Sequence, residues 1–464
     1  MAAIEFKNLY FRYNSESKIL LRNLNIQLDY GSFVLIIGDS GIGKSTIMNL
    51  INGTIPNYIH GDIAGDILIN GVSNKKKSIS EISKEVGSVL QNADMQIIHE
   101  IVEDEIAFGC ENLCMNKDDI TKLVDKYTDL LSLDKKYETK KLSGGQKQRL
   151  ITASTLSMGQ HIIMLDEPLA NLDNKASIVI LNILKRLVKE ENYLVILVEH
   201  RIDRLKDYAD LIYVLENETL QLKTYQDIAS NSNEEIEYGI NNNINENVLI
   251  SLENVSIKFK NKLVLDNISF DIFEGERLLI LGENGIGKTT LSKIISRLIK
   301  PTVGKVCSNI SKRHWFKNVG YIFQNPDYQL FMPTVKKELE YACKDKELLE
   351  YSIKYLKIEE ILDHHPYSLS EGQKRKIAAL SIILMAPKLL ILDEPTVGLD
   401  NESLIKLLDI INILNEKYGT AVISITHDKR CAKALSDRVI WLKDKRIYKM
   451  GDKELVDLYF MGDK

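Results

Sequence analysis

Residues 38–46 read Gly38-Asp39-Ser40-Gly41-Ile42-Gly43-Lys44-Ser45-Thr46 and follow the apolar run Phe33–Ile37. Four residues separate the first glycine from the Gly-Lys-Ser triplet, which is the spacing of a phosphate-binding loop between a strand and a helix. In such a loop, backbone N–H groups converge on phosphate oxygens at a helix N-terminus, and the lysine supplies a positive charge. The hydroxyl of Ser45 is suited to bind Mg²⁺. The sequence therefore predicts a phosphate site here.

The same pattern returns 244 residues later as Gly282-Glu283-Asn284-Gly285-Ile286-Gly287-Lys288-Thr289-Thr290. Other residues recur in step with it, since Gln91 returns as Gln324 after 233 residues and Glu167 returns as Glu394 after 227. The shrinking offset is expected when loops are shortened on a common scaffold. The repeat indicates two homologous domains.

The domain boundaries follow from a change in composition. Residues 229–247 are polar, rich in Asn and without helical or alternating apolar periodicity, so we expect a flexible linker there. The two domains are then residues 1–228 and 248–464. Within each, short continuous apolar runs such as Leu194–Val198 alternate with segments of helical length, which is typical of strands buried on both faces of a parallel sheet. The predicted class is α/β.

Composition and charge argue against a nucleic-acid-binding protein and against a membrane-spanning one. The chain has 464 residues, of which 44% are hydrophobic and 27% charged, as in an ordinary folded globular protein. Its 60 basic and 65 acidic residues are interspersed and give a net charge of −5, so we expect no nucleic acid partner. No apolar run approaches the roughly 18 residues of a membrane span, and any membrane role is expected to be peripheral.

Paired carboxylates follow an apolar run in each copy. Asp166-Glu167 comes after Ile162–Leu165, and Asp393-Glu394 comes after Leu389–Leu392. Ligands bind at the carboxyl ends of the strands in such sheets. The first carboxylate is suited to hold Mg²⁺ through water, and the second to polarise a water molecule for attack on a γ-phosphate. We therefore expect Glu167 and Glu394 to be catalytic.

A short serine and glycine motif opens an amphipathic segment in each copy, as Ser143-Gly144-Gly145-Gln146 and as Ser370-Glu371-Gly372-Gln373. Ser-x-x-Gln is also the form of a helix capping box. A cap does not account for the glycine, which costs about 1 kcal/mol in a helix and is useful where a ligand approaches closely. With these residues, the sequence resembles the ATP-binding subunits of ABC transporters over nearly its whole length, and Glu371 departs from the signature pattern of that family.

The resemblance implies two tandem ABC ATPase domains, each with a mainly parallel sheet core, an antiparallel subdomain and a helical subdomain. It implies ATP and Mg²⁺ as ligands. By the same resemblance, Gln91 and Gln324 match the Q-loop, and His200 and His427 match the switch histidine that contacts the γ-phosphate. Asn171-Leu172-Asp173 and Gly398-Leu399-Asp400 match the D-loop.

Two further sets of site residues come with the resemblance. Tyr13 and Phe259 fall at the aromatic position that stacks on adenine, although a core role for them is an equal alternative. The implied Mg²⁺ ligands are Ser45, Asp166 and Gln91 in the first domain, and Thr289, Asp393 and Gln324 in the second. The implied nucleotide contacts are all residues of both phosphate loops and both signature motifs.

Each domain has two helix N-termini suited to anions, the phosphate loop and the signature, but only one triphosphate to bind. A head-to-tail, pseudo-twofold pair resolves this mismatch because the signature of one domain completes the phosphate site of the other. A linker of about 19 residues reaches at most about 60 Å when extended, which is enough to join the pair. Since both domains belong to one chain, no obligate homodimer is expected.

The segments Gln91–His99 and Gln324–Met332, which follow the Q-loop glutamines, are similar to those of energy-coupling factor ATPases. That family powers vitamin and metal uptake. The resemblance implies two kinds of partner, a membrane-embedded coupling subunit and a small substrate-binding membrane subunit. It places the chain at the cytoplasmic face of the cell membrane as a peripheral protein.

Two other functions remain open, a soluble tandem ABC ATPase of translation or DNA repair and the tandem ATPase of a sugar importer. The first usually carries a long charged helical arm between its copies, whereas this linker is short and lacks heptads. The second usually has one degraded site, whereas both copies here keep Lys, Asp, Glu and His. The transported molecule is not encoded in this chain, since specificity would lie in a partner.

Overall fold

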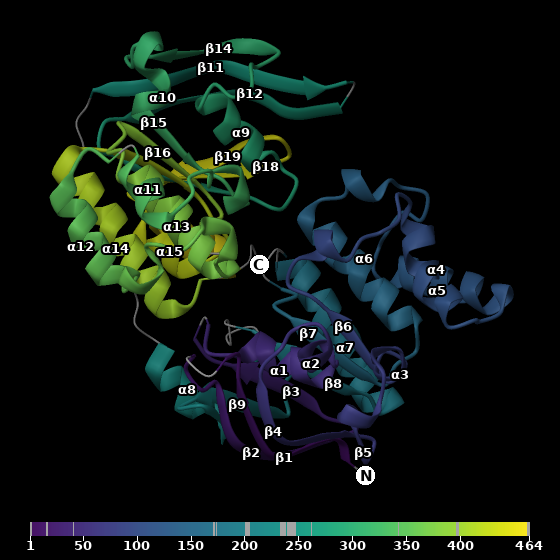
Figure 1. Cartoon of the computed structure of the whole chain (residues 1–464). Helices are drawn as coiled ribbons and strands as arrows, with labels where there is room; N and C mark the ends of the chain where they lie inside the picture. Colours follow the sequence, from purple (N-terminus) through teal and green to yellow (C-terminus); the bar gives the residue numbers. More distant parts are fainter. Residues whose placement is uncertain are drawn as a thin grey trace. The chain divides into compact units, whose positions relative to one another are not determined.

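The computed structural model describes residues 2–14, 17–39, 41–169, 172, 174–199, 205–232, 238, 247–260, 262–341, 343–395 and 399–461. The chain divides into two compact units, Met1–Asn233 and Glu234–Lys464 (Figure 1). The division falls inside the range expected as a linker. Helix α8 (Tyr225–Ser232) extends four residues into that range, and Tyr238 packs against apolar residues of the second unit.

The first unit contains two sheets. A four-stranded antiparallel sheet has the order β2-β1-β4-β5, and a six-stranded sheet has the order β10-β9-β3-β8-β7-β6. All neighbours in the second sheet are parallel except β10 and β9. The strands are β1 (Ala2–Arg12), β2 (Leu21–Asp29), β3 (Phe33–Ile37), β4 (Asp62–Ile69), β5 (Val72–Ser73), β6 (Val86–Val89), β7 (Ile162–Asp166), β8 (Leu194–Val198), β9 (Leu211–Glu216) and β10 (Thr219–Lys223).

The helices of the first unit fall into two groups. Helices α4, α5 and α6 contact one another and form a helical layer, and α1 and α7 accompany the parallel sheet. Their bounds are α1 (Lys44–Ile51), α2 (Thr54–Asn57), α3 (Ile79–Ile82), α4 (Val102–Asn112), α5 (Lys117–Leu130), α6 (Gly144–Ser157) and α7 (Asn174–Glu191), with 3₁₀ turns η1 (Asn74–Lys76), η2 (Ala93–Met95) and η3 (Thr139–Lys141).

The second unit repeats this plan with a three-stranded antiparallel sheet, β12-β11-β14, and a six-stranded sheet, β15-β16-β17-β13-β18-β19. Only β18 and β19 are antiparallel in the larger sheet. The strands are β11 (Val248–Phe259), β12 (Lys262–Phe273), β13 (Arg277–Leu281), β14 (Val303–Ser308), β15 (Val319–Ile322), β16 (Leu389–Asp393), β17 (Ala421–Ile425), β18 (Arg438–Lys443) and β19 (Arg446–Gly451).

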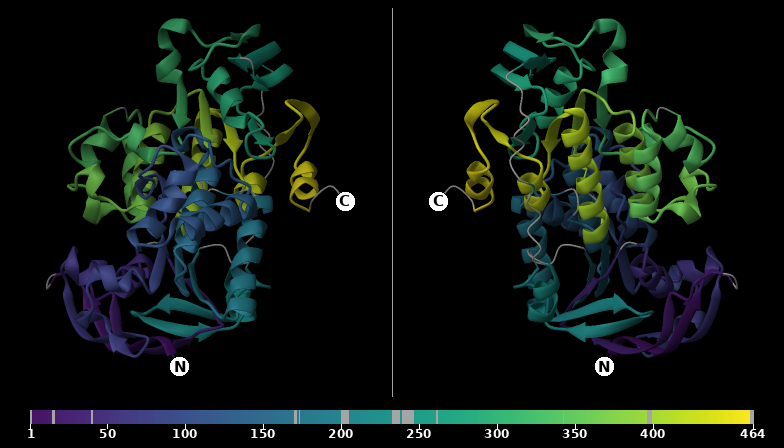
Figure 2. Two further views of the ribbon diagram at one scale, coloured as in Figure 1. Left: turned by 90° about the vertical axis from the view of Figure 1, so that its right-hand side faces the viewer. Right: turned by 90° about the vertical axis from the view of Figure 1, so that its left-hand side faces the viewer.

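The helices of the second unit largely correspond to those of the first, and α16 falls at the repeat position of α8. Helix α16 covers β13 and β18 through the buried side chain of Val456, and Figure 2 shows this helix in yellow. The bounds are α9 (Lys288–Ile295), α10 (Trp315–Asn318), α11 (Val335–Glu340), α12 (Lys346–Leu356), α13 (Glu371–Ile383), α14 (Asn401–Tyr418), α15 (Lys429–Ala434) and α16 (Glu454–Met461), with 3₁₀ turns η4 (Lys312–His314), η5 (Pro326–Tyr328), η6 (Glu359–Ile361) and η7 (Pro366–Ser368).

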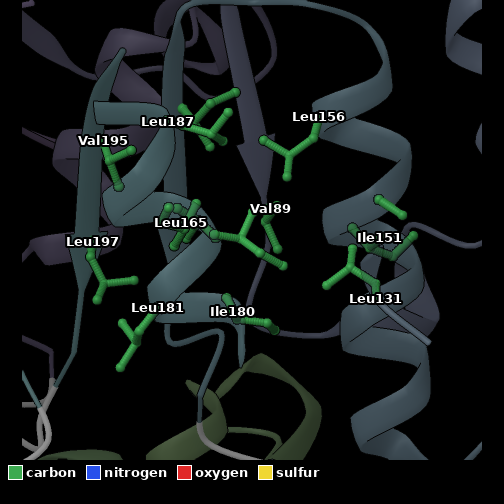
Figure 3. Close-up of a cluster of buried hydrophobic side chains, with 14 of the residues drawn as sticks. Val89, Leu131, Ile151, Leu156, Leu165, Ile180, Leu181, Leu187, Val195 and Leu197 are labelled. Carbon is green, nitrogen blue, oxygen red and sulfur yellow. The ribbon is translucent and has the colours of Figure 1, made fainter. Parts of the chain in front are cut away.

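The core explains why the strands read as continuous apolar runs. Every residue of β3, β7 and β8 is buried, because the antiparallel sheet and α1 pack on one face of the six-stranded sheet and the helices α6 and α7 on the other. Figure 3 shows side chains of the face that α6 and α7 cover, among them Leu165 and Val195 of the strands and Leu187 of α7. The predicted α/β fold of two repeated domains is confirmed. No helix among the described residues is long and apolar enough to cross a membrane.

Candidate active site

The first phosphate loop joins the end of β3 to the start of α1. Gly43 precedes the helix with φ 114°, a left-handed conformation that favours glycine. Lys44 is only 5% exposed, and its Nζ donates hydrogen bonds to the carbonyl oxygens of Gly38 and Asp39 at 2.7 and 2.8 Å. The lysine thereby folds back over its own loop. Of the other loop residues, Gly41 and Ser45 are exposed, Ile42 is half-buried and Thr46 is buried, while Ser40 lies outside the described residues.

The second phosphate loop has the same form between β13 and α9. Gly287 has φ 108°, and Lys288 Nζ lies 2.7 Å from the Gly282 carbonyl and 3.1 Å from that of Glu283. This loop contacts the switch histidine of its own domain, His427. His427 Nε2 lies 2.8 Å from Asn284 Oδ1 and 3.3 Å from Lys288 Nζ. Glu283, Gly285 and Thr289 are exposed, and Ile286 and Thr290 are half-buried.

The paired carboxylates lie where β7 and β16 end. Asp166 and Asp393 are the last strand residues and are 8% and 5% exposed. Glu167 and Glu394 follow them in the left-handed region, with φ 46° and 54°. Residues other than glycine are uncommon there, and the conformation costs about 1–3 kcal/mol. The same strain in both copies turns each glutamate out of the strand direction, and nothing in the sequence had indicated it.

Each catalytic glutamate contacts another predicted site residue of its own domain. In the first, Gln91 Nε2 donates to Glu167 Oε2 at 2.8 Å. In the second, the backbone N–H of His427 donates to Glu394 Oε2 at 3.2 Å, and the imidazole Nε2 lies 3.5 Å from Glu394 Oε1. Gln324 is exposed. The predicted His200 lies outside the described residues.

Asp393 is enclosed by hydroxyl groups. Thr289 Oγ1 donates to Asp393 Oδ1 at 3.1 Å, and Tyr321 Oη donates to Asp393 Oδ2 at 2.9 Å. Burial raises the pKa of the Asp393 carboxyl, and the two hydrogen bonds oppose that rise. A hydroxyl and a carboxylate in contact are oxygen donors of the kind that Mg²⁺ prefers, so this donor set fits the metal. The sequence had indicated Thr289 and Asp393 but not Tyr321.

The signature motifs begin helices α6 and α13. Ser143 and Ser370 are exposed N-caps, and each forms a complete capping box with Gln146 or Gln373. The predicted cap is therefore present in both copies, and Gly144 is exposed, Gly145 half-buried and Gly372 buried in the first turn. Glu371 lies in that turn of α13, with its carboxylate 3.5 Å from Lys374 Nζ.

The remaining predicted contacts differ in how much the structure describes. Tyr13 is 40% exposed, and its hydroxyl lies 3.0 Å from Thr46 Oγ1, which brings the aromatic ring beside the first phosphate loop. Phe259 is 46% exposed at the end of β11. In the D-loops, Asn171, Asp173 and Gly398 lie outside the described residues, whereas Asp400 is the N-cap of α14.

A bridge of hydrogen bonds follows each Q-loop glutamine. Gln96 accepts from the N–H of Leu90 at 2.7 Å and donates to the carbonyl of Ser88 at 3.0 Å. Glu105, 3% exposed, accepts from the N–H groups of Ile98 and His99 at 2.8 and 2.7 Å. Gln329 and Glu338 make the equivalent bonds in the second copy.

The same segments are bonded to the signature helices. Lys147 of α6 pairs with Asp94, and Lys374 of α13 pairs with Asp327 at 3.2 Å. In each domain the chain beyond the Q-loop glutamine is therefore fixed both to the strand before it and to the helical layer. The recurrence of these residues in both copies was the only signal of their role in the sequence.

Comparison with known proteins agrees with this geometry. The ABC transporter family matches residues 21–170 and 265–397. The chain belongs to the ABC transporter ATP-binding family. Its two ABC domains make it an ATPase, and they imply that ATP is the nucleotide bound.

Among the relatives of this ABC protein, one from Bacillus cereus named as an ABC transporter ATP-binding protein is 32% identical over 509 residues, which cover 96% of this chain and 90% of the relative. Another so named, from Treponema denticola, is 31% identical over 473 residues, or 96% of each chain. The archaeal ribosome recycling factor, solved in complex with a ribosomal stalk protein, has a TM-score of 0.68 and 22% identity over 98% of this chain and 92% of its own. At that identity the likeness concerns the fold alone.

Proposed function

We propose that this ABC ATPase powers a membrane importer of the energy-coupling factor type, for a vitamin, a related small molecule or a metal ion. Its partners in this proposal are a membrane-embedded coupling subunit and a small substrate-binding membrane subunit. The chain then works as a peripheral protein at the cytoplasmic face of the cell membrane. The names of its relatives as transporter ATP-binding proteins support a membrane partner in general.

The observation that carries the proposal is the fixed bridge after each Q-loop glutamine. It holds a short segment whose outer side chains are apolar and exposed. Met95 and Ile98 are 77% and 66% exposed in the first domain, and Tyr328 and Phe331 are 78% and 66% exposed in the second. Exposed apolar side chains on a rigid support are typical of a protein contact. Both domains therefore offer a partner the same kind of contact close to the catalytic glutamate.

A cavity beside the first of these segments supports the same proposal. Its volume is about 390 Å³, and Gln96, Ile98, Phe108, Ile151 and Met158 are among its lining residues. The lining mixes apolar side chains with a larger number of polar ones, such as Ser88, Glu105 and Gln160, and an amphipathic helix could place both of its faces against such a surface. A coupling helix of the membrane subunit seated there would lie directly against the Q-loop bridge.

At each catalytic site the chain has groups for the separate tasks of phosphoryl transfer. We assign Lys44 and Lys288 to the phosphate charge, because each is held in its loop with its ammonium group buried among backbone carbonyls. Glu167 and Glu394 polarise the attacking water. Gln91, which bonds to Glu167, is positioned to link the water to the bridge.

The assigned Mg²⁺ ligands are Thr289, Asp393 and Gln324 in the second domain and Ser45, Asp166 and Gln91 in the first. When bound, Mg²⁺ neutralises charge on the β- and γ-phosphates. The contact between Thr289 and Asp393 supports the assignment, because it brings a hydroxyl and a carboxylate together at the end of the phosphate loop.

The two sites in this proposal are composite. A head-to-tail pairing of the domains lets Ser143-Gly144-Gly145 complete the site of Lys288, and lets Ser370-Glu371-Gly372 complete the site of Lys44. The exposed N-caps Ser143 and Ser370 support this arrangement, since each leaves a helix N-terminus open to an anion. ATP is then held between a phosphate loop and a signature motif.

Site-specific photo-crosslinking tests the membrane partner. A photoreactive phenylalanine analogue replaces Met95 in one variant and Tyr328 in another, and the chain is irradiated in native membranes. Leu222 and Tyr448, which are 61% and 43% exposed on the edge strands β10 and β19, are the matched control positions. We expect crosslinks from positions 95 and 328, identified by mass spectrometry, to a membrane protein with several spans, and none from the controls.

Two results would contradict the proposal. Crosslinks from both positions to ribosomal proteins would favour the soluble alternative in translation. Equal crosslinking from positions 95, 328, 222 and 448 would show that the Q-loop segments contact a membrane partner no more than the control positions do.

A further inference from the structure

The second domain contains a buried hydroxyl network that reaches Asp393, the aspartate at the end of β16. Tyr321 lies in β15, is 7% exposed and donates to Asp393 Oδ2 at 2.9 Å. Ser292 of α9 lies beneath it, with Oγ 2.8 Å from Tyr321 Oη and 2.9 Å from the carbonyl of Thr289. Thr289 Oγ1 donates to the other oxygen of the same carboxylate at 3.1 Å. Both oxygens of Asp393 thus have a fixed donor.

The first domain lacks the residues for this network. Ser88 stands at the repeat position of Tyr321, and Met48 stands at that of Ser292. Met48 is 3% exposed and belongs to an apolar cluster. The strand that precedes the first Q-loop glutamine therefore presents the short side chain of Ser88 where the second domain has the phenol of Tyr321. The first domain, with Ser88, can therefore be compared with the second domain, with Tyr321, to measure the effect of the tyrosine.

The direction of the bonds follows from the number of protons. An ionised carboxylate can only accept, so Tyr321 gives its single hydroxyl proton to Asp393. The single hydroxyl proton of Ser292 then goes either to Tyr321 Oη or to the carbonyl oxygen of Thr289, which are both within hydrogen-bond distance. A donor on Oδ2 limits rotation of the carboxylate about its last torsion, and it does so inside a buried site where the bond is strengthened by low polarity.

We infer that Tyr321 is a positioning residue that holds the Asp393 carboxylate in the orientation that binds the metal of the nucleotide, and that this device operates in the second domain only. The inference rests on the proposed role of Asp393 as a metal ligand. Tyr321 touches neither ATP nor the metal and acts through the aspartate. Partners of metal ligands have this effect generally, and their loss typically lowers metal affinity by about 10- to 100-fold.

Nucleotide binding with and without metal tests the inference. A fluorescent ATP analogue is titrated into the full chain carrying Lys44→Ala, so that binding reports the second domain, once with Mn²⁺ and once with EDTA. The dissociation constant in EDTA divided by the dissociation constant in Mn²⁺ measures how much the metal contributes to binding. We expect Tyr321→Phe to reduce this ratio about 10-fold or more, and to change the affinity in EDTA by less than about twofold.

Two controls separate positioning from general damage. Tyr355→Phe removes a tyrosine hydroxyl that donates to another aspartate of the same domain, Asp409, at 2.5 Å, and it should leave the ratio unchanged. In an Asp393→Asn background, Tyr321→Phe should have no further effect, because the residue acts only through that carboxylate. In the first domain, measured in a Lys288→Ala background, Tyr321→Phe should likewise leave the metal contribution unchanged.

The outcomes distinguish this inference from the metal assignment beneath it. If Asp393→Asn itself leaves the ratio unchanged, the proposed metal site is wrong. If Asp393→Asn abolishes the metal contribution while Tyr321→Phe changes it by less than about twofold, or weakens binding equally in EDTA, only the positioning role is overturned. If Tyr321→Phe does not fold, as judged by circular dichroism, Ser292→Ala decides: a reduced ratio supports the role, and an unchanged one overturns it.

Discussion

Glu371 places a carboxylate in one signature motif and not in the other, so the two proposed ATP sites should turn over at different rates. In the head-to-tail arrangement that we propose, this motif would serve the site of Lys44 and Glu167. The carboxylate lies 3.5 Å from Lys374 Nζ and its side chain is 32% exposed, so both the lysine and water screen it. Two unit charges 4 Å apart interact by about 1 kcal/mol in water, and screening brings the expected cost to about 0.3–1 kcal/mol.

That cost converts to a rate difference of roughly two- to fivefold between the sites. If the sites turn over independently, the site of Lys288 and Glu394 carries about two-thirds to five-sixths of the steady-state rate. Phosphate release measured on Glu394→Gln and Glu167→Gln checks this division. We expect Glu394→Gln to lose the larger share, and Glu371→Gly to raise the rate of the parent chain.

Glu371→Gln is the matched control because it removes the charge and keeps the length of the side chain. It should raise the rate as Glu371→Gly does, while a thermal melt should show a small loss of stability, since a carboxylate in the first helical turn contributes about 0.3–1 kcal/mol. Equal losses from the two glutamate variants, or a larger loss from Glu167→Gln, would refute the reasoning. An unchanged rate in Glu371→Gln would refute the role of the charge.

Three further predictions concern binding, coupling and stability. Lys44→Ala and Lys288→Ala should each remove one of two sites in a titration with a fluorescent ATP analogue, and two full-affinity sites in either variant would contradict the phosphate-loop assignment. Glu105→Ala deprives two backbone N–H groups of their acceptor, at a cost of about 1–3 kcal/mol each. It should abolish the stimulation of ATPase activity by a membrane partner and leave the basal rate unchanged. A basal rate that falls as much as the stimulated rate would contradict this. Asp437→Ala removes the carboxylate that pairs with Arg277, which is 2% exposed. It should lower the free energy of unfolding by about 3–5 kcal/mol, as measured by denaturant titration. A loss under about 1 kcal/mol would show that the ion pair behaves like a solvated surface pair.

The sequence predicted the parts of each site that depend on local spacing. The phosphate loops, the carboxylates at the strand ends and the capping boxes are each encoded within a few consecutive residues, and each is where its pattern indicated. Because the domain is repeated, each of these patterns occurs twice in the sequence. The two domains were predicted from the repeat, and the linker between them was predicted from a change in composition, which is also a local signal.

The missed features depend on contacts between distant residues. Tyr321 reaches Asp393 across 72 positions of the chain, and strand periodicity alone marks it as a core residue. The left-handed conformation of Glu167 and Glu394 runs against the preference of a residue before proline for extended backbone, so local rules predict the opposite. Gln96 and Glu105 look like ordinary polar residues until the fold brings backbone groups to them.

The ATPase rate of the chain with and without its membrane partners tests the central claim most directly. The chain is purified alone and as a complex extracted from native membranes in gentle detergent, and a chain carrying both Glu167→Gln and Glu394→Gln gives the background rate. The account predicts slow hydrolysis by the chain alone, a several-fold higher rate in the complex and no response to added ribosomes. Equal rates for the free chain and the complex, or stimulation by ribosomes in place of membrane proteins, would contradict it.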